Sequence, residues 1–398
     1  MKQGTRLLDR APLVLLAVFA ALALTGTASY FIQGKPNSGD LYPHYAAGRL
    51  WAAGEHHALY RGNILGQRVD AWQQERFPES GEAPRDHFNY LYPPLCAMLA
   101  ARLSEYPFQA WAWIWPVLSL VFYAASCLLL VPALTGPANR SLGCLATLAF
   151  PPLHYALYIG QLSPLTLLVA SAACLLLARG RPLCAGAVMS LVFYKPQLLP
   201  WLGLFMLFCG HWRFTLAAAA GSATWLVLGV VLAGVQAHLD WLACLGEMAS
   251  GLQSMRLGVN LSLRGVLETL AGGHARWIDL LSMVAGVALL AGVAKFVRQY
   301  RHLTPASDPA GALALGLAAS LLASPYVCHY DFLLAVPWML AVTTSRGATL
   351  GWSLILFWLA GLLSIAGLLA GWPYAGLLLA LWWAWTVRKP WVAVPVSQ

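Results

Sequence analysis

The sequence predicts an all-α, polytopic membrane protein, and three observations lead to this fold class. Hydrophobic residues make up 60% of the chain and charged residues only 10%. Apolar runs long enough for a helix to cross a bilayer recur from end to end. The basic residues stand in short clusters between these runs, as topology signals do. We therefore expect a single integral membrane domain over residues 1–398, with no separate soluble domain.

The first predicted span runs from Ala11 to Phe31 and follows Lys2, Arg6 and Arg10. A signal peptide begins in the same way. The apolar run continues past the small residues at 25–29 and many further spans follow, which favours a retained membrane helix over a cleaved signal. The chain then leaves the membrane on the outer side.

Eleven further spans are expected, which makes about twelve transmembrane helices in all. They lie near residues 108–133, 141–158, 162–178, 183–194, 197–210, 214–235, 277–294, 310–323, 326–343, 348–367 and 372–387. The short pair around Lys195-Pro196 has one long span as its alternative. A proline and a lysine in the middle favour a break.

The distribution of positive charge supports twelve spans over eleven. With twelve spans, the segments on the inside hold most of the basic residues between spans, including Arg140, Arg179 and Arg213. With eleven, Lys295 and Arg298 would face outward, against the positive-inside rule. Both chain ends are therefore expected inside.

Two long segments remain outside, at residues 33–107 and 236–276. In the first, Tyr45–Ala53 and Ile64–Arg76 are short, amphipathic stretches that predict helices lying on the membrane surface. In the second, Trp241 and the leucines that follow it recur at helical spacing and predict another interfacial helix.

Cysteines and net charge add no further site. The eight cysteines lie mostly in apolar runs without CxxC spacing, so we expect packing residues and neither a disulfide framework nor a metal site. The net charge of +9 is explained by the topology signals, so nucleic-acid binding is not expected.

Six polar clusters break the apolar chain, and all of them fall on the outer side of the predicted topology. They centre on Asp40, Tyr92, Gly160, Lys195, Asn260 and His329. Alone, each is explained as a turn or a helix cap, and Asp40 in particular as an N-cap. Together they bring a lysine, an arginine, a histidine and two aspartates to one surface, where Asp40 could accept a proton from a substrate hydroxyl.

In this order, the clusters resemble glycosyltransferase family 87, whose members are membrane enzymes of the GT-C fold. The resemblance runs from about residue 38 to 335 and rests on Asp40-Leu41-Tyr42, Tyr45-Ala46-Ala47, Tyr92-Pro93-Pro94, Gly160-Gln161, Lys195-Pro196, Asn260-Leu261-Ser262-Leu263-Arg264 and the Ser324-Pro325 to His329-Tyr330 segment. It implies that Asp40 is the catalytic aspartate of the first outer loop and that the donor is a sugar on a polyprenyl phosphate. Because the family includes mannosyltransferases, mannose is the expected sugar. The chain departs from the family after residue 340, where no motif matches.

The residues suit that chemistry, since a phosphate leaving group needs counter-charge more than it needs a proton. We expect Asp40 to deprotonate the acceptor hydroxyl, with inversion at the sugar, while Lys195, Arg264 and His329 bind the donor phosphate. Lys195 could instead snorkel to the head groups, and His329 could carry protons or be a boundary histidine.

Further substrate-binding candidates are Tyr42, Tyr45, Tyr92, Gln161, Gln197, Asn260 and Asp331. For the tyrosines the alternative is anchoring at the membrane interface, and for Asp331 it is capping the following helix. The sequence indicates no metal ligand and no cofactor, and it neither requires nor rules out a divalent cation. A nucleotide sugar is disfavoured as the donor because no Asp-x-Asp motif is present.

The expected function is therefore transfer of a sugar from a polyprenyl-phosphate donor to a lipid or glycan acceptor, at the extracytoplasmic face of a bacterial inner membrane and in contact with membrane lipids. Two alternatives stay open. A glycan ligase or polymerase that uses a polyprenyl-diphosphate donor would suit Arg256, Arg264 and His274 in the second outer loop. A lipid or solute transporter would suit the broken helix at Lys195-Pro196.

Overall fold

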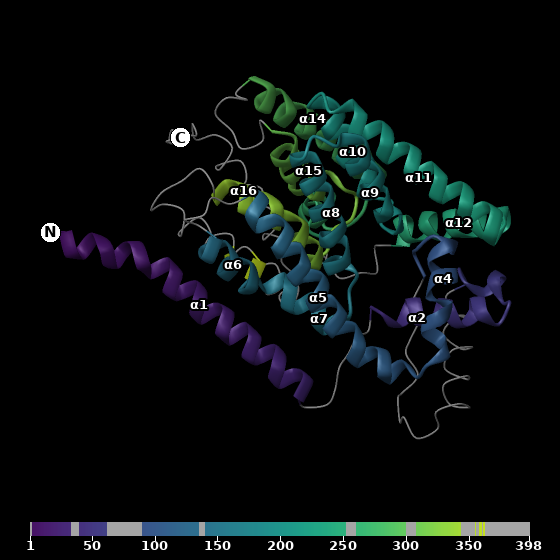
Figure 1. Ribbon diagram of the computed structural model, residues 1–398. Coiled ribbons are helices and arrows are strands. Elements are labelled where there is room, and N and C mark those ends of the chain that lie inside the picture. Colours follow the sequence, from purple (N-terminus) through teal and green to yellow (C-terminus); the bar gives the residue numbers. More distant parts are fainter. Residues whose placement is uncertain are drawn as a thin grey trace.

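The computed structural model describes residues 2–32, 40–61, 90–134, 140–251, 260–299, 308–343 and the single positions 355, 358, 359, 361 and 362. Within these residues the chain is helical and contains no strand (Figure 1), so the predicted all-α class is confirmed. The predicted helix Ile64–Arg76, and nearly all of the predicted spans at 348–367 and 372–387, lie outside the described residues.

Four described helices are long and apolar enough to cross a membrane, namely α1 (Lys2–Ile32), α5 (Phe108–Leu134), α11 (Trp212–Ala233) and α14 (Arg276–Gln299). Shorter apolar helices pack among them: α8 (Ser163–Ala178), α9 (Pro182–Met189), α10 (Leu199–Phe208) and α15 (Pro309–Ala323). The membrane character is thus supported, while the count of twelve spans stays a prediction. All eight cysteines are free, as expected.

One predicted span is wrong. The run at 141–158 forms two helices, α6 (Arg140–Leu148) and α7 (Pro151–Ile159), separated by Phe150 in an extended conformation. The cause is Pro151-Pro152, because proline fits the first turn of a helix but cannot continue one. A proline also drives the residue before it out of the helical region.

The break at Lys195-Pro196 is where the sequence predicts it. A 3₁₀ segment, η5 (Ser190–Tyr194), follows α9, and α10 begins only at Leu199. The predicted span at 326–343 likewise consists of a 3₁₀ segment, η8 (His329–Ala335), followed by α16 (Val336–Thr343). Short 3₁₀ segments therefore adjoin the ends of several apolar helices.

The core lies around α15, which is packed on by α8, α10, α14 and α16. Every residue of α15 from Ala310 to Ala323 is buried, as expected for a helix that is apolar on all sides. Gly316 allows the close approach of α10, since a side-chain carbon there would lie 2.6 Å from the ring of Phe205. The centre of the molecule is thus closely packed and apolar.

A second, smaller group of helices covers one end of this core. It comprises α2 (Tyr42–Ala52), η1 (His56–Ala58), α4 (Pro94–Ala100), η3 (Ala101–Glu105), α12 (Val235–Gly251) and α13 (Leu263–Leu270). The helices predicted near Tyr45–Ala53 and around Trp241 are present as α2 and α12. Trp241 Nε1 donates a hydrogen bond of 3.0 Å to the carbonyl of Leu91, which joins the two outer segments.

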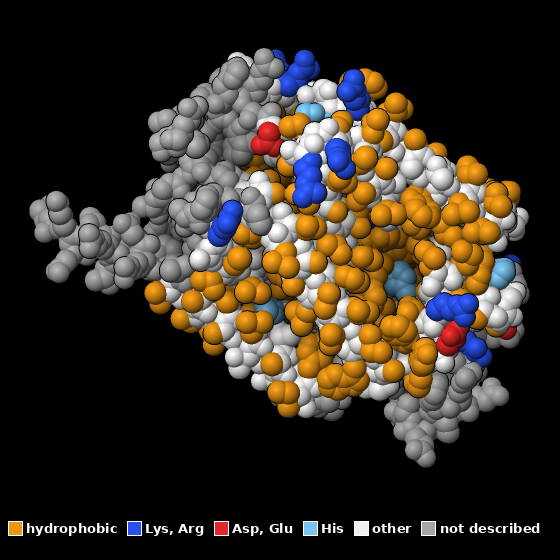
Figure 2. All heavy atoms as spheres, in the orientation of Figure 1, with side chains coloured by type: hydrophobic (Ala, Val, Ile, Leu, Met, Phe, Trp, Pro, Cys, Tyr) orange, Lys and Arg blue, Asp and Glu red, His pale blue; other side chains and the backbone are white. Residues whose placement is uncertain are grey.

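The helices run back and forth between two ends of the molecule. We call the end with the exposed residues Arg179, Arg213 and Lys295 the basic end, and the end with α2, α4 and α13 the loop end. α8 begins at the loop end with Ser163 and reaches Arg179 after 16 residues, about 24 Å away. Figure 2 shows basic side chains at the top and left, and again over α2 and α4 at the lower right, with a broad apolar surface between them.

Candidate functional site

The end of α7 holds the Asp40 carboxylate in place. The backbone N–H of Asp40 donates to the carbonyl of Ile159 at 2.8 Å. Gly160 then ends α7 in the left-handed conformation, with φ of +78°, a region that favours glycine. The turn directs the next residue back toward the first outer segment, so that Gln161 Nε2 donates a hydrogen bond to Asp40 Oδ2.

Gln161 is itself held in place by α5. Its side chain is buried, and its carbonyl accepts a hydrogen bond of 3.3 Å from Trp115 Nε1 on α5. The Gly160-Gln161 turn therefore holds the carboxylate in place, and it brings two of the predicted site residues, Asp40 and Gln161, into direct contact.

The start of α8 and the break before α10 meet at Lys195. Lys195 Nζ donates to Asp331 Oδ1 at 2.5 Å and to Ser163 Oγ at 3.0 Å. The side chains of Lys195 and Asp331 are 6% and 10% exposed, so this is a buried ion pair. An ammonium group has three donors, and two of them make these hydrogen bonds. The Nζ atom also lies 5.5 Å from the centre of the Tyr330 ring, and its third N–H has no oxygen acceptor among the described residues, so it can serve an oxygen of a bound anion.

Asp331 has two tasks, and the sequence anticipated only one. Its Oδ2 accepts the backbone N–H of Cys328 at 3.1 Å and so caps η8, the capping alternative noted above. Its Oδ1 is the counter-ion of Lys195, a partner for this lysine that the sequence does not predict. A buried charge needs a partner of opposite sign, and for Lys195 the protein itself supplies one in Asp331.

His329 lies next to this pair, at the start of η8. Its side chain is buried, and its ring meets Tyr155 edge-on with centroids 4.7 Å apart. Nδ1 of His329 has no hydrogen-bond partner among the described residues. Buried polar atoms are normally paired, so an unpaired one at a candidate site favours a ligand contact.

The charges of Lys195 and Asp331 act on the carboxyl group of Asp40. Burial raises the pKa of Asp40 above the usual value for a carboxyl group. The hydrogen bond from Gln161 and the positive charge of Lys195 act in the opposite direction, and the negative charge of Asp331 raises the pKa further. We call Asp40, Gln161, Ser163, Lys195 and Asp331 the Asp40 cluster.

The three predicted tyrosines separate into two kinds. Tyr42 and Tyr45 are fully buried on α2 and pack on Phe108 with ring centroids 5.0 and 5.4 Å away, so both contribute to packing, and their role in substrate binding stays a prediction. Tyr92 lies against His44 with centroids 4.1 Å apart. Burial and then the charges of Asp40 and Asp331 raise its pKa, which places Tyr92 beside the Asp40 cluster.

The side chain of Asn260 links the segment before α13 to the segment before η8. Its Nδ2 donates to the carbonyl of Pro325 at 2.9 Å, and its Oδ1 accepts the backbone N–H of Val327 at 3.1 Å. Two of the resembling motifs, around Asn260 and Ser324-Pro325, therefore bind each other. Gln197 is half-buried in the break before α10 and forms no hydrogen bond with another described residue.

Arg264 has counter-ions of its own. Its Nε lies 3.0 Å from Glu268 Oε1 and 3.0 Å from Asp279 Oδ1, and its Nη2 lies 3.3 Å from His274 Nδ1. Atoms of Glu268, His274 and Asp279 lie within 4.8 Å of one another, close enough to share a cation, but the guanidinium already bridges both carboxylates. These contacts of Arg264 tie α13 to α14.

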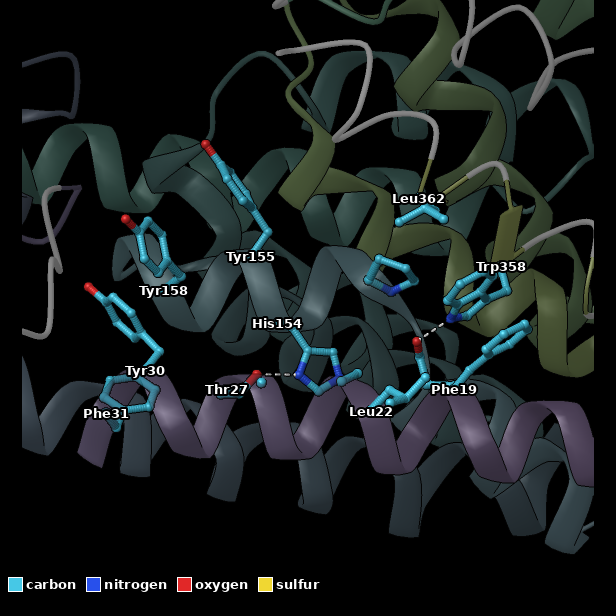
Figure 3. Close-up of a pocket in the computed structure, with 14 residues that line it drawn as sticks. Phe19, Leu22, Thr27, Tyr30, Phe31, His154, Tyr155, Tyr158, Trp358 and Leu362 are labelled. Atoms are coloured by element: carbon cyan, nitrogen blue, oxygen red, sulfur yellow. Dashed lines mark hydrogen bonds between the residues drawn. The ribbon is translucent and has the colours of Figure 1, made fainter. Parts of the chain in front are cut away.

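A groove of about 640 Å³ runs between α1 and α7 (Figure 3). At one end lie Phe19, Trp358 and Leu362, and at the other Tyr30, Tyr155 and Tyr158 carry their hydroxyls. On its floor Thr27 Oγ1 donates to His154 Nδ1 at 2.8 Å, because His154 Nε2 donates to the carbonyl of Leu148. The groove is apolar apart from these groups.

The hydroxyl end of the groove adjoins the Asp40 cluster. Tyr158 directly precedes Ile159, whose carbonyl binds Asp40, and Tyr155 touches His329. From Tyr30 back to Phe19 the groove follows α1 for about 17 Å, toward the basic end. The end of the groove that carries the tyrosine hydroxyls is therefore the end nearer to the Asp40 cluster, and the opposite end is apolar.

Three residues of this site were missed from the sequence. Ser163 has the pattern of a residue that opens a helix, since Pro164 follows it, and Tyr155 stands in an apolar run. His44 lies within the Asp40 motif, but nothing in the sequence marks which way its ring points. Only Ser163 carried a usable signal, its place directly after the Gly160-Gln161 turn.

Comparison with known proteins gives one match. The family model described as glycosyltransferase family 87 matches residues 90–325, which is more than half of the chain. This range contains Tyr92, Gln161, Ser163 and Lys195, while Asp40 lies before it and Asp331 after it. No curated protein and no solved structure matches the chain.

Proposed function

The chain belongs to glycosyltransferase family 87 and is by that membership a membrane glycosyltransferase, and we propose that it moves a sugar from a polyprenyl-phosphate donor to a hydroxyl of a lipid or glycan acceptor. Mannose is the proposed sugar. The reaction inverts the configuration at the anomeric carbon.

One observation carries this proposal: a half-buried carboxylate and a buried lysine lie close to the hydroxyl end of an apolar groove. Asp40 is held by Gln161 and shares its electrostatic environment with Lys195, while Tyr155 and Tyr158 lead from this cluster into the groove. A polyprenyl-phosphate sugar has the same two parts, a polar head and a long apolar tail. The groove would hold the first part of the tail and the Asp40 cluster the head.

In the proposed reaction, Asp40 accepts the proton of the acceptor hydroxyl as the oxygen attacks the anomeric carbon. The bond between that carbon and the phosphate oxygen breaks at the same time, and the leaving polyprenyl phosphate keeps the electron pair. The proton ends on Asp40. A base whose pKa is raised by burial holds a proton better than an ordinary aspartate, which suits this role.

Lys195 and His329 would stabilise the negative charge that grows on the leaving phosphate. The ammonium has one donor beyond those given to Asp331 and Ser163, and His329 has a buried Nδ1 without a described partner. Lys195 can therefore bind a phosphate oxygen without giving up its ion pair. Neither cofactor nor metal is part of this scheme.

The orientation of the protein follows from the positive-inside rule. The exposed residues Arg140, Arg179, Arg213, Lys295 and Arg298 lie at helix ends opposite the Asp40 cluster. We therefore place the cluster on the extracytoplasmic face of a bacterial inner membrane, where lipid-linked sugars are the available donors.

The direct test offers purified protein in vesicles a labelled sugar on three carriers. Label from polyprenyl-phosphate mannose is expected to appear in a lipid or glycan product with inverted anomeric configuration, read by mass spectrometry and NMR. Polyprenyl-diphosphate sugars and nucleotide sugars are expected to give no product. Transfer from the diphosphate carrier alone would indicate a ligase or polymerase, and movement of the lipid across the bilayer without any transfer would indicate a transporter.

The pH dependence of transfer is a second test. The base must be ionised, and the pKa of Asp40 is raised, so kcat/KM is expected to fall on acidification at a pH above the range of an ordinary aspartate. The Gln161→Met substitution removes a hydrogen bond to the ionised form, which should move this acid limb to still higher pH. An acid limb that stays in place in the variant would contradict the assignment of this limb to Asp40.

A further inference from the structure

His44 is a buried aromatic side chain whose outer nitrogen lacks a partner. It lies in the first turn of α2, four positions after Asp40, and its backbone N–H donates to the carbonyl of Leu41 at 3.1 Å. The side chain is 5% exposed, yet Nε2 forms no hydrogen bond with any described residue. Leaving a buried nitrogen without a hydrogen bond costs free energy, so such an atom in a folded protein calls for an explanation, such as a contact with a ligand.

The surroundings of His44 place it at the edge of the Asp40 cluster. Its ring lies on Tyr92, with centroids 4.1 Å apart, and meets Tyr90 edge-on at 5.8 Å. Tyr92 is close enough to Asp40 and Asp331 for their charges to raise its pKa. The rings of His44 and Tyr92 thus stack on each other, and Tyr92 is within electrostatic reach of Asp40 and Asp331.

The charge state of His44 selects the kind of group it can bind. Burial lowers the pKa of His44 to about 3, and the nearby positive charge of Lys195 acts in the same direction. The ring is therefore neutral at physiological pH. A neutral imidazole has one donor and one acceptor nitrogen, which suits a hydroxyl group, and it lacks the positive charge that Lys195 offers to a phosphate.

We propose that His44 Nε2 binds a hydroxyl group of a substrate in the glycosyl-transfer site, on either the transferred sugar or the acceptor, with Tyr92 supporting the ring from the other side. This inference rests on the proposed function. It makes His44 a substrate-binding residue that helps to choose which sugar, or which acceptor, is accepted.

The test compares His44→Phe, His44→Gln and the control Tyr90→Phe. Phenylalanine keeps a ring on Tyr92 and removes the nitrogen, so kcat/KM is expected to fall about 10-fold, the effect of one lost hydrogen bond. The midpoint of thermal unfolding should stay the same or rise, because an unpaired buried polar atom has been removed. Glutamine can place an amide near the Nε2 position and should restore part of the activity.

Tyr90→Phe is a matched control because it also removes an unpaired buried polar atom from the same ring cluster. The hydroxyl of Tyr90 has no described partner, but the charges that act on it are those of Cys96, Tyr60 and Tyr92, not those of the Asp40 cluster. Transfer is therefore expected at the wild-type rate. An equal loss in Tyr90→Phe and His44→Phe would mean that packing alone is disturbed and would overturn the proposal.

Deoxy substrates separate the two sources of the hydroxyl. If it is on the donor, one monodeoxy analogue of polyprenyl-phosphate mannose should lose about 10-fold with the wild-type protein and nothing further with His44→Phe. If it is on the acceptor, all donor analogues should behave alike in both proteins, and the KM for the acceptor should rise in the variant. Unchanged KM and kcat for both substrates would refute the role of His44, whereas a wild-type protein that transfers from no polyprenyl-phosphate sugar would refute the proposed function itself.

Discussion

Asp40→Asn is expected to lower transfer by about 100-fold or more while leaving donor binding intact, the usual scale for loss of a general base. Asparagine has the shape of aspartate, and its side-chain oxygen can still accept the hydrogen bond from Gln161. The contacts that hold residue 40 at the end of α7 should therefore persist. What is lost is only the ability to take a proton from the acceptor hydroxyl.

A second aspartate of the loop end provides the control. Asp240 on α12 also accepts a hydrogen bond from a glutamine, Gln236 Nε2, at 2.8 Å, but it lies outside the Asp40 cluster. Asp240→Asn should transfer sugar at the wild-type rate. Turnover, binding of the polyprenyl-phosphate sugar and thermal unfolding would be measured for both variants, and near-normal turnover in Asp40→Asn would eliminate Asp40 as the base.

That Asp40, Gln161 and Lys195 lie at the same end of the molecule could be predicted, because this depends only on the number and lengths of the apolar runs. In an apolar chain, the lengths of the runs fix the end of each helix at which a polar residue lies. The structure brings these residues to one end from α7, from the break before α10 and from the segment before α2. The helix break at Lys195-Pro196 followed in the same way, from the geometry of proline.

The partners of the charged residues could not be predicted by counting. Which neighbour a side chain meets depends on the rotation and tilt of its helix, and neither is encoded in the length of an apolar run. That Arg264 binds the donor phosphate therefore stays a prediction, and its ion pairs with Glu268 and Asp279 were not anticipated. Glu268 stands four residues after Arg264, so one of these two ion pairs did have a sequence signal.

The predicted span at 141–158 was wrong for a different reason. Pro151-Pro152 was visible in the sequence, yet a run of apolar residues on both sides favoured a single span. The turn at Phe150 lets α7 begin anew and end at Gly160, against Asp40. A helix that continued straight from Arg140 would have placed Gln161 elsewhere, so the proline pair is part of what builds the site.

Removal of either member of the Lys195–Asp331 pair is expected to destabilise the protein strongly. The two side chains are 6% and 10% exposed, and breaking a buried pair leaves one charge without a partner, at a cost of about 3–5 kcal/mol. Lys195→Met and Asp331→Asn should each lower the midpoint of thermal unfolding clearly. In Asp331→Asn the side-chain oxygen can still cap η8, so most of this loss would come from the unpaired lysine.

The double substitution Lys195→Met/Asp331→Asn separates structure from catalysis. It leaves no unpaired charge, so thermal stability should recover much of what each single variant loses. Transfer should not recover, because the ammonium that offers its third donor to the leaving phosphate is gone, and donor binding should stay weak. If stability and transfer returned together, the ion pair would serve the fold alone, and the phosphate of the donor would have to be bound by other residues.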